Sequence, residues 1–522
     1  MVNQLFYGDN LEVLRKYIKD ETIDLCYIDP PFNSKRNYNQ IYNNVGKEDQ
    51  AQAQAFVDTW TWDDYANQGL DQILTNYHGR FTQQSIDLIS GLNKVLGKGS
   101  LLAYLVSITL RIAEIHRVLK DTGSFYLHCD PTASHYLKLI LDAIFCSQGG
   151  DFLNEIIWCY SERGISKNYY NKKHDVILFY SKKANKHIFN YQSIVTEYSE
   201  STTKKFKHID EQGRSFRLRG RNVPEAGKLR RKTDIPLKDE CEYTYRQYLD
   251  DSDGVLAKDW IEIPFINQAA KERLGYPTQK PEALLEILIK ASSNEGDLIL
   301  DAYCGCGTTV AVAQNLDRQW IGIDITYQSI SLILKRLEDK FGQGILDNIK
   351  LNGIPKDAES AVALANKKDD RTRKEFEKWA VLTYTNNRAI INPKKGSDKG
   401  IDGLVYFRSE KNDTEKVIFQ VKSGKAKSGD IRDLQGTMTL EGAEMGVFIT
   451  LNEPTKEMIK TAKSAGIYQN KFMSQSYDKI SIVTIQEIIE EKKRFNLTLI
   501  HEVLKSAEKV REVNSDQLGL FE

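Results

Sequence analysis

Four consecutive residues near the N-terminus carry groups that could act on an amine attached to a planar ring. They are Asp29, Pro30, Pro31 and Phe32, and they follow a buried-strand pattern at residues 23–28. A carboxylate and a backbone carbonyl can both accept hydrogen bonds from an amine, and proline adds no competing N–H donor. An aromatic ring offers a face for a base rotated out of a duplex. The motif favours a site for a nucleobase amine, with an ordinary strand-ending turn as the alternative.

A second candidate site lies where a strand at 298–300 runs into a helix. The residues of this loop that could contact a ligand are Asp301, Tyr303, Gly305, Gly307 and Thr308. Glycine permits a tight turn close to a ligand, and the free N–H groups at a helix start attract an anionic group. Asp324 ends the next strand, where a carboxylate can accept both hydroxyls of a ribose. The loop and this carboxylate together indicate a nucleoside-containing ligand.

Two other interpretations of this loop are weaker. A nicotinamide oxidoreductase would need a third glycine in its dinucleotide fingerprint, but Val310 occupies that position. A metal site built on Cys304 and Cys306 would need a second cysteine pair at ligand spacing, which the sequence lacks.

These motifs sit in alternating strand and helix patterns. Strand patterns at 23–28, 124–128 and 298–300 alternate with helical periodicity at 101–120 and 281–290. Such alternation predicts an α/β protein with a doubly wound parallel sheet. No apolar stretch approaches the ~20 residues of a membrane helix, and we expect a cytoplasmic protein without membrane contact.

A basic segment separates the two motif-bearing blocks. Residues 204–232 contain eleven Lys or Arg and three acids, although the net charge of the whole chain is zero. A concentration of positive charge suits a polyanion such as nucleic acid, and a solvated loop is the alternative. We interpret residues 185–262 as an insertion that carries recognition.

In their order along the chain, these motifs resemble the β-group of amino-methylating DNA methyltransferases, which includes the modification subunits of type III restriction systems. The resemblance covers residues 3–335 and includes the segment Tyr276-Pro277-Thr278-Gln279-Lys280-Pro281. It implies site-specific methyl transfer from S-adenosylmethionine to double-stranded DNA, as in restriction-modification. Asp29 favours adenine N6 as the acceptor, because members with Ser at that place usually methylate cytosine N4, the alternative.

The resemblance also implies contacts to S-adenosylmethionine. Thr278, Lys280 and the loop 301–308 would hold its methionine part, Asp324 its ribose, and Asp9 would lie near its adenine. Phe32 stands where Tyr is commoner, which keeps the stacking face and loses one hydroxyl.

A second α/β pattern at residues 371–488 carries another candidate site. Asp402 precedes a strand, and Gln420 and Lys422 share one face of the next strand. Two oxygen ligands can hold Mg²⁺ against a phosphate, and a lysine can activate water. This resembles the Mrr-type restriction endonuclease domain, which implies Asp402 and Gln420 as Mg²⁺ ligands and Glu377 as the helical acid. The alternatives are an inactive nuclease fold retained for DNA binding and an ordinary α/β domain.

The expected domain organisation has six segments. They are the catalytic half of the methyltransferase (1–184), the recognition insertion (185–262), the donor-binding half (263–345), a linker (346–370), the nuclease-like domain (371–488) and a helical tail (489–522). The chain ends in Gln517-Leu518-Gly519-Leu520-Phe521, which is similar to short peptides that dock on bacterial sliding clamps and implies such a partner. A clamp-tethered DNA-binding protein with relic catalytic folds is the alternative from outside the enzymes.

Overall fold

A computed structural model describes most of the chain. The described residues are 2–31, 36–44, 47–58, 60–160, 167–168, 170–220, 244–251, 254–267, 270–274, 276, 278–355, 358–365, 370–386, 389–391, 400–410, 413–470 and 475–496. Phe32 and the terminal segment 517–521 lie outside these ranges, so the predictions that fall on them have no structural description.

A nine-stranded sheet forms the centre of the N-terminal part, in the order β11-β6-β7-β5-β2-β12-β13-β1-β14. Its strands are β1 (Asn3–Tyr7), β2 (Ile23–Ile28), β5 (Leu119–Cys129), β6 (Asp151–Cys159), β7 (His174–Ser181), β11 (Trp260–Glu262), β12 (Leu298–Asp301), β13 (Gln319–Asp324) and β14 (Ile349–Asn352). Neighbouring strands run parallel except where β7 pairs with β5 and β6. The central strand β2 is buried along its whole length, as its apolar sequence requires in a sheet covered on both faces. The predicted doubly wound α/β class is confirmed.

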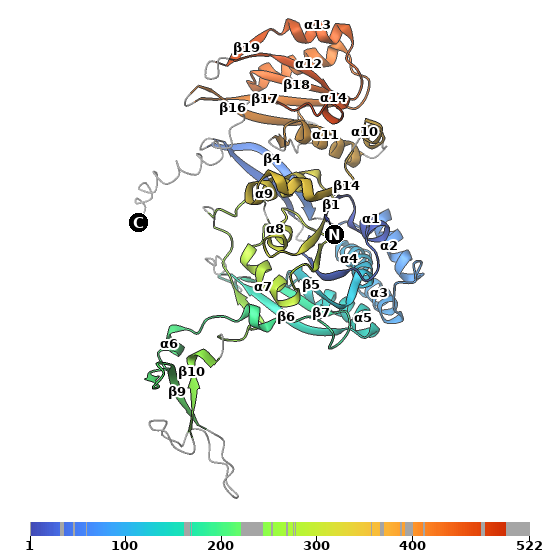
Figure 1. Cartoon of the computed structure of the whole chain (residues 1–522). Coiled ribbons are helices and arrows are strands. Elements are labelled where there is room, and N and C mark those ends of the chain that lie inside the picture. Colours follow the sequence, from blue (N-terminus) through green and yellow to red (C-terminus); the bar gives the residue numbers. More distant parts are fainter. Residues whose placement is uncertain are drawn as a thin grey trace, which may run out of the picture.

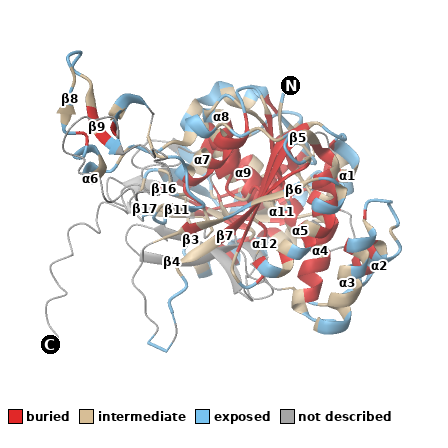
Figure 2. Cartoon of the chain, turned by 90° about the horizontal axis from the view of Figure 1, so that it is seen from below, coloured by how far each residue is buried: buried red, intermediate tan, exposed pale blue. Residues whose placement is uncertain are grey.

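Helices cover both faces of this sheet (Figure 1). One layer contains α1 (Asn10–Tyr17), α4 (Ser100–Val118) and α5 (Ser134–Ile144), with α2 (Asp64–Leu74) and α3 (Gln83–Leu96) packed outside it. The other layer contains α7 (Glu282–Ser292), α8 (Thr308–Asn315) and α9 (Tyr327–Phe341). Alternate residues of β2 divide between two apolar clusters, Leu25 and Tyr27 in one and Cys26 and Ile28 in the other. Figure 2 shows the buried residues concentrated where these layers meet.

The sheet topology brings distant motifs to one edge. β12 lies between β2 and β13, and all three strands run in the same direction. Asp301 and Asp324 end β12 and β13, and Asp29 directly follows β2. Three carboxylates from separate parts of the chain therefore meet at the carboxyl edge, the usual ligand side of such a sheet.

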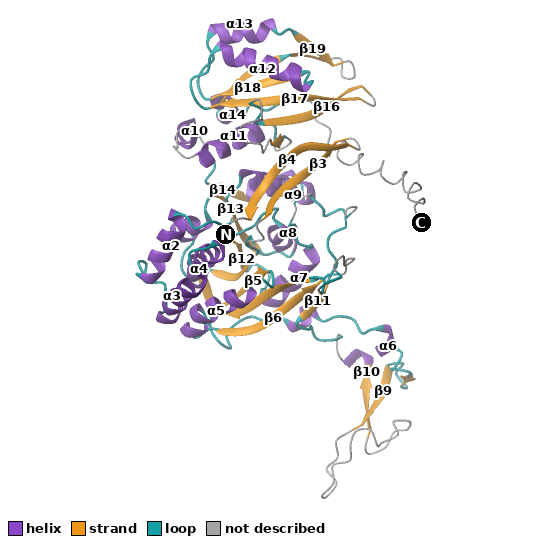
Figure 3. Ribbon diagram, turned by 180° about the vertical axis from the view of Figure 1, so that it is seen from behind, coloured by secondary structure: helices purple, strands orange, loops and turns teal. Residues whose placement is uncertain are grey.

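A small sheet stands away from the large one, as Figures 1 and 3 both show. It follows α6 (Glu200–Thr203) and contains β8 (His208–Ile209), β9 (Ser215–Gly220) and β10 (Thr244–Tyr248). The segment expected as an insertion at 185–262 thus contains a sheet of its own, and its last three residues form β11, which returns to pair with β6. A further antiparallel hairpin, β3 (Arg36–Asn44) and β4 (Lys47–Asp58), follows the Asp29 motif.

The C-terminal part contains a separate five-stranded sheet, β15-β16-β17-β18-β21. Its elements are α10 (Ala358–Ala365), α11 (Asp370–Tyr384), β15 (Ile390–Ile391), β16 (Gly403–Glu410), β17 (Asp413–Lys422), α12 (Ser428–Glu441), β18 (Met445–Thr450), α13 (Lys456–Ser464), β19 (Ile467–Asn470), β20 (Gln475–Asp478), β21 (Ile480–Thr484) and α14 (Ile485–Ile489). This is the smaller α/β domain expected from the sequence. α11 contacts the N-terminal part, where a Glu375 oxygen accepts the N–H of Tyr327 at 3.0 Å.

The segment 346–370 differs from the expected linker. It contains β14, the edge strand that pairs with β1, and α10. In β14 the apolar Ile349 and Leu351 alternate with two polar residues. A strand of four residues is too short for this alternation to be recognised in a sequence. Across the described ranges, no helix is both long and apolar enough to cross a membrane.

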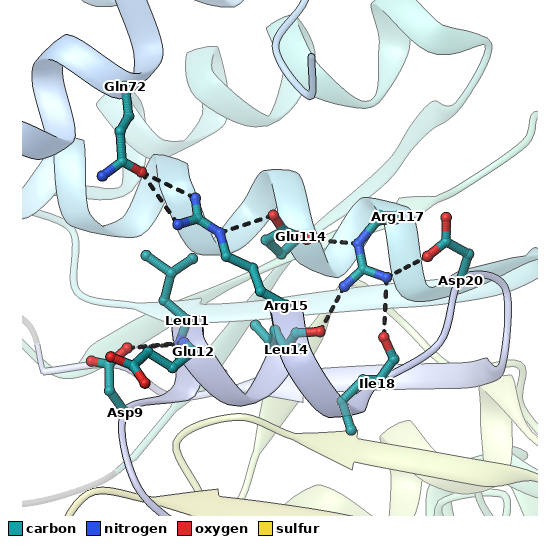
Figure 4. Close-up of polar contacts among 10 residues, drawn as sticks. All are labelled: Asp9, Leu11, Glu12, Leu14, Arg15, Ile18, Asp20, Gln72, Glu114 and Arg117. Atoms are coloured by element: carbon teal, nitrogen blue, oxygen red, sulfur yellow. Dashed lines mark hydrogen bonds and ion pairs between the residues drawn. The ribbon is translucent and has the colours of Figure 1, made fainter. Parts of the chain in front are cut away.

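A buried charge network fixes α1 against α4 (Figure 4). Glu114 accepts hydrogen bonds from Arg15 at 3.1 Å and from Arg117 at 2.6 Å. Arg117 also donates to the carbonyls of Leu14 and Ile18 at the end of α1, at 2.6 and 3.0 Å. Asp9 caps the start of the same helix, so this network positions a residue at the carboxyl edge.

Replacing Glu114 by Ala should strongly destabilise the N-terminal part. The Glu114 side chain is 4% exposed, and its loss leaves the nearly buried Arg117 guanidinium without its closest buried carboxylate. We expect a loss of about 3–5 kcal/mol in the free energy of unfolding, measured by urea titration. Glu12→Ala, which removes an exposed ion pair on the same helix, is the control and should leave the urea midpoint unchanged. Equal midpoints for both variants would contradict this role of Glu114.

Candidate active site

The Asp29 carboxylate is held by Lys280. The Lys280 Nζ donates to Asp29 Oδ2 at 2.5 Å, and the side chains are 8% and 18% exposed. We expected Lys280 to hold the methionine part of S-adenosylmethionine. Its ammonium instead contacts the carboxylate of Asp29, the residue expected to bind the base. Lys280 is the only hydrogen-bond partner of Asp29 within the described ranges, which leaves Asp29 Oδ1 available to a ligand. Thr278, from the same segment, is partly buried.

The glycine loop after β12 is shaped by backbone conformations that favour glycine. Gly305 and Gly307 have φ values of 47° and 74°. A Cβ at Gly307 would lie 2.7 Å from Ile333 Cγ1, so a side chain there would collide with α9. The N–H of Gly305 donates to Asp324 Oδ2 at 2.9 Å, which ties the loop to the end of β13. The loop is therefore packed closely against α9 and tied to the end of β13.

Arg336 supports this loop from behind, a role that the sequence did not indicate. Its buried guanidinium donates to the Cys306 carbonyl and to Thr308 Oγ1, both at 3.1 Å. It also pairs with Glu282 at 2.8 Å. Cys306 and Cys304 are buried free thiols, and no metal-binding group of three or more His, Cys, Asp or Glu occurs among the residues described.

Two carboxyl groups at the edge have raised pKa values. Burial raises the pKa of Asp301 to about 7, and the charges of Asp29 and Asp324 add to the shift. Burial also raises the pKa of Asp324 to about 6, against hydrogen bonds from Thr326 and Gly305 that lower it. A cationic ligand would favour the ionised forms of both groups. The site suits a ligand that combines positive charge with ribose hydroxyls.

Asp9 is largely engaged by the protein itself. Its Oδ1 accepts the N–H groups of Leu11 and Glu12, and its Oδ2 pairs with Arg111 at 2.9 Å. Asn10, the next residue, donates to the carbonyl of Ala302 at 2.7 Å. Asp9 thus caps α1 close to the glycine loop after β12. Its contact with the adenine of S-adenosylmethionine stays a prediction.

A buried polar relay lies beside Asp29 at the same edge. Tyr27 Oη lies 2.8 Å from His128 Nδ1, and His128 Nε2 lies 3.2 Å from Asp175 Oδ2. The Tyr160 hydroxyl donates to the other Asp175 oxygen at 3.2 Å. The sequence predicted strands that contain Tyr27 and His128, but it did not predict the polar contacts of these residues.

An aromatic cluster borders this relay. The rings of Tyr160 and Phe265 have centroids 4.0 Å apart, and Trp158 lies 5.2 Å from Phe265. Phe265 is 37% exposed, so part of this cluster faces solvent. This aromatic surface lies at the end of β6, three strands from β2 in the sheet.

The second candidate site lies where Asp402 meets β17 in the C-terminal domain. Asp402 Oδ2 accepts the N–H of Val421 at 2.6 Å, and Gln420 Oε1 is a buried atom with no hydrogen-bond partner in the described part of the chain. Lys422 pairs with Asp430 at 3.0 Å, a contact that sequence reasoning missed. Glu377 lies on α11, as expected.

Comparison with known proteins identifies the N-terminal part. A family model described as DNA methylase, for N6 and N4 amino methylation, matches residues 23–335, which is more than half of the chain. DNA adenine methyltransferase YhdJ of Escherichia coli K12 is 26% identical over 335 residues, which cover 64% of this chain and 82% of that protein. Type II methyltransferase M.HpaI of Haemophilus parainfluenzae is 29% identical over 231 residues, which cover 44% of this chain and 58% of that protein. The chain belongs to the N6/N4 DNA methylase family, whose members are S-adenosylmethionine-dependent methyltransferases.

A solved structure gives a more distant match. PvuII DNA methyltransferase, titled cytosine-N4-specific, has 14% identity and a TM-score of 0.38, with 67% of this chain and 91% of that chain covered. The C-terminal part, residues 373–490, matches a family model described as NACHT-associated inactive Restriction Endonuclease 1. The predicted restriction-endonuclease-like domain is thereby confirmed, and the word inactive belongs to the description of that family.

The pKa values of Asp301 and Asp324 predict a pH-dependent affinity for S-adenosylmethionine. With pKa values of about 7 and 6, both groups ionise between pH 5 and 8, so affinity for the cationic donor should rise over this range. We expect binding about tenfold tighter at pH 8 than at pH 6, measured by calorimetry. Without donor, the free energy of unfolding should fall as the pH rises from about 4 to 7, because the folded state holds these protons more tightly.

The control for this measurement is a pair of variants. Asp301→Asn should bind the donor more weakly and lose most of the pH dependence, whereas Asp339→Asn, at the exposed end of α9, should keep it. An unchanged pH dependence in Asp301→Asn would show that another group controls donor binding.

Proposed function

We propose that this chain methylates adenine N6 in duplex DNA, with S-adenosylmethionine as donor, in restriction-modification. The observation that carries the proposal is the Asp29 carboxylate, which Lys280 holds by one oxygen beside the donor loop. Support also comes from the family match and from a relative whose printed name is DNA adenine methyltransferase.

The donor loop fits S-adenosylmethionine. Gly305 and Gly307 take left-handed backbone conformations that shape the loop, and the edge carries the buried Asp301 and the partly buried Asp324 carboxyl groups for positive charge and ribose hydroxyls. When bound, this donor supplies a methyl group activated by a sulfonium. Asp324 would hold the ribose, and Asp301 with the loop backbone would hold the methionine part.

Asp29 would then act on the acceptor amine. Its Oδ1, together with the Pro30 carbonyl, would accept hydrogen bonds from the two amine hydrogens and localise the nitrogen lone pair. Lys280 orients this carboxylate through Oδ2. As the new C–N bond forms and the S–C bond breaks, Asp29 is placed to receive the proton that the amine loses. Positioning of the two reactants supplies much of the rate enhancement.

Cytosine N4 is the alternative acceptor, because its exocyclic amine would make the same hydrogen bonds. The aspartate at position 29 favours adenine, as the resemblance to the family implies.

Mass analysis of nucleosides from treated DNA tests this proposal. Wild-type protein with labelled donor should produce N6-methyladenine, and Asp29→Ala should lower the rate by about 10²- to 10⁴-fold. Asp87→Ala, an exposed aspartate on α3, is the control and should retain full activity. Formation of N4-methylcytosine alone would replace the adenine assignment, and full activity of Asp29→Ala would contradict the role of Asp29.

We further propose that the C-terminal domain binds DNA without cutting it. Lys422, expected to activate water, is held by Asp430, and Gln420 supplies a weaker metal ligand than a carboxylate. Binding of Mg²⁺ by Asp402 and Gln420 stays a prediction, as do the sliding-clamp contact of residues 517–521 and a cytoplasmic location.

Incubation of unmethylated duplexes with the protein and Mg²⁺ tests this second proposal. The duplexes should remain intact, and Asp402→Ala should behave like the wild type. Mg²⁺-dependent cleavage that disappears in Asp402→Ala and in Lys422→Ala would instead establish an active nuclease.

A further inference from the structure

Two arginines lie on one face of the small sheet. Arg217 and Arg219 are two residues apart on β9, so their side chains point to the same side, while Phe216 and Leu218 are buried on the other. Arg217 pairs in register with Gln247 of β10. This face therefore carries both guanidinium groups, with the buried Phe206 ring against that of Arg217, and the opposite face carries the buried Phe216 and Leu218.

One glutamine aligns both arginines. The Nε of Arg217 and the Nε of Arg219 donate to the same oxygen, Gln247 Oε1, at 3.0 and 2.9 Å. An arginine that uses Nε in this way keeps both terminal nitrogens for another partner. The Arg217 guanidinium also lies over the ring of Phe206, with Cζ 4.5 Å from its centroid, which fixes the guanidinium plane.

The charges of these two arginines are not neutralised within the sheet. Arg214, on the same hairpin, pairs with Asp250 at 2.7 Å and with Asp251 at 2.9 Å. Among the residues that the structure describes, Arg217 and Arg219 have no carboxylate partner and share one neutral amide oxygen. Burial and the charge of Arg219 lower the pKa of Arg217. Two aligned positive charges that share a neutral amide oxygen suit a ligand rich in hydrogen-bond acceptors.

We propose that Arg217 and Arg219 read guanine in the major groove of the target duplex, with Gln247 as the residue that positions them. The terminal nitrogens of an arginine match the O6 and N7 acceptors of guanine, the commonest specific contact in that groove. A two-stranded ribbon fits the major groove. The two-residue strand β8 pairs only with Ser215 and Phe216, so from Arg217 onward β9 and β10 form a two-stranded ribbon, and the small sheet stands away from the large one (Figures 1 and 3). This inference rests on the proposed action on duplex DNA.

A bidentate contact to guanine requires a fixed orientation of the donor groups, whereas a contact to phosphate does not. A phosphate oxygen can accept from an ammonium as well as from a guanidinium, whereas the guanine edge needs two donors in one plane. The shared glutamine and the Phe206 ring fix that plane for Arg217, which favours base reading. Arg-to-Lys substitutions keep the charge and remove the planar pair of donors, so they separate the two modes.

Selection of bound duplexes from a random library, followed by sequencing, tests the inference without using methylation as the readout. The DNA sequence selected by the wild-type protein should contain an invariant G·C pair. Arg219→Lys and Arg217→Lys should each reduce discrimination at such a pair by roughly 5- to 150-fold, with little loss of overall affinity. Gln247→Leu should reduce it as well, because both arginines lose their alignment. Arg246→Lys, on the opposite face of β10, is the matched control and should leave the selected sequence unchanged.

A duplex with 7-deazaguanine at the invariant position gives the sharper measurement. It lacks the N7 acceptor, so it should weaken binding by the wild type and have little further effect on the matching Arg-to-Lys variant. A selected sequence without an invariant G·C pair, or variants that keep the sequence and only weaken binding at all sites, would overturn the inference. Selection of such a pair by a protein that produces no methylated base would contradict the proposed function and leave the reading of guanine established.

Discussion

The structure depends on one constraint, that the ends of β2, β12 and β13 share a sheet edge. The ion pair between Lys280 and Asp29 spans 251 positions of the sequence and closes at that edge. It forms because β2 and β12 are neighbours, although the basic insertion and the strands β5 to β7 separate them along the chain. The base motif and the donor motif can cooperate only in this arrangement.

The same edge concentrates negative charge in a buried environment. Asp29, Asp301 and Asp324 lie near one another, and among the described residues only Asp29 of the three has a lysine partner. Burial raises the pKa values of Asp301 and Asp324, and repulsion from the charges of Asp29 and Asp324 adds to the shift of Asp301. A cationic donor would relieve this repulsion, so the electrostatics that lower the stability of this edge favour binding of the donor. Arg336 and the network around Glu114 hold the surrounding loop and helix in place.

Residues at the ends of strands were predictable from the sequence, and their long-range partners were not. Asp29, Asp301 and Asp324 each come at the end of an apolar strand pattern. Gly305 and Gly307 predict a turn from the local sequence alone. The partner of Lys280 depends on the order of strands in the sheet, which no local pattern contains. His128 with Asp175, and Gln247 with its two arginines, are likewise brought together by strand pairing. In the C-terminal domain the motif of Asp402, Gln420 and Lys422 was visible, but the competing contact of Lys422 with Asp430 was not.

The central claim is that one edge of the sheet holds both the donor and the acceptor amine. The most direct measurement is a structure of the protein in complex with the donor analogue sinefungin and a duplex that contains the target sequence in unmethylated form. We predict a target adenine turned out of the duplex, its amine within hydrogen-bond distance of Asp29 Oδ1 and the ribose of the analogue on Asp324. An adenine that remains stacked, or an amine that contacts residues away from Asp29, would contradict the account.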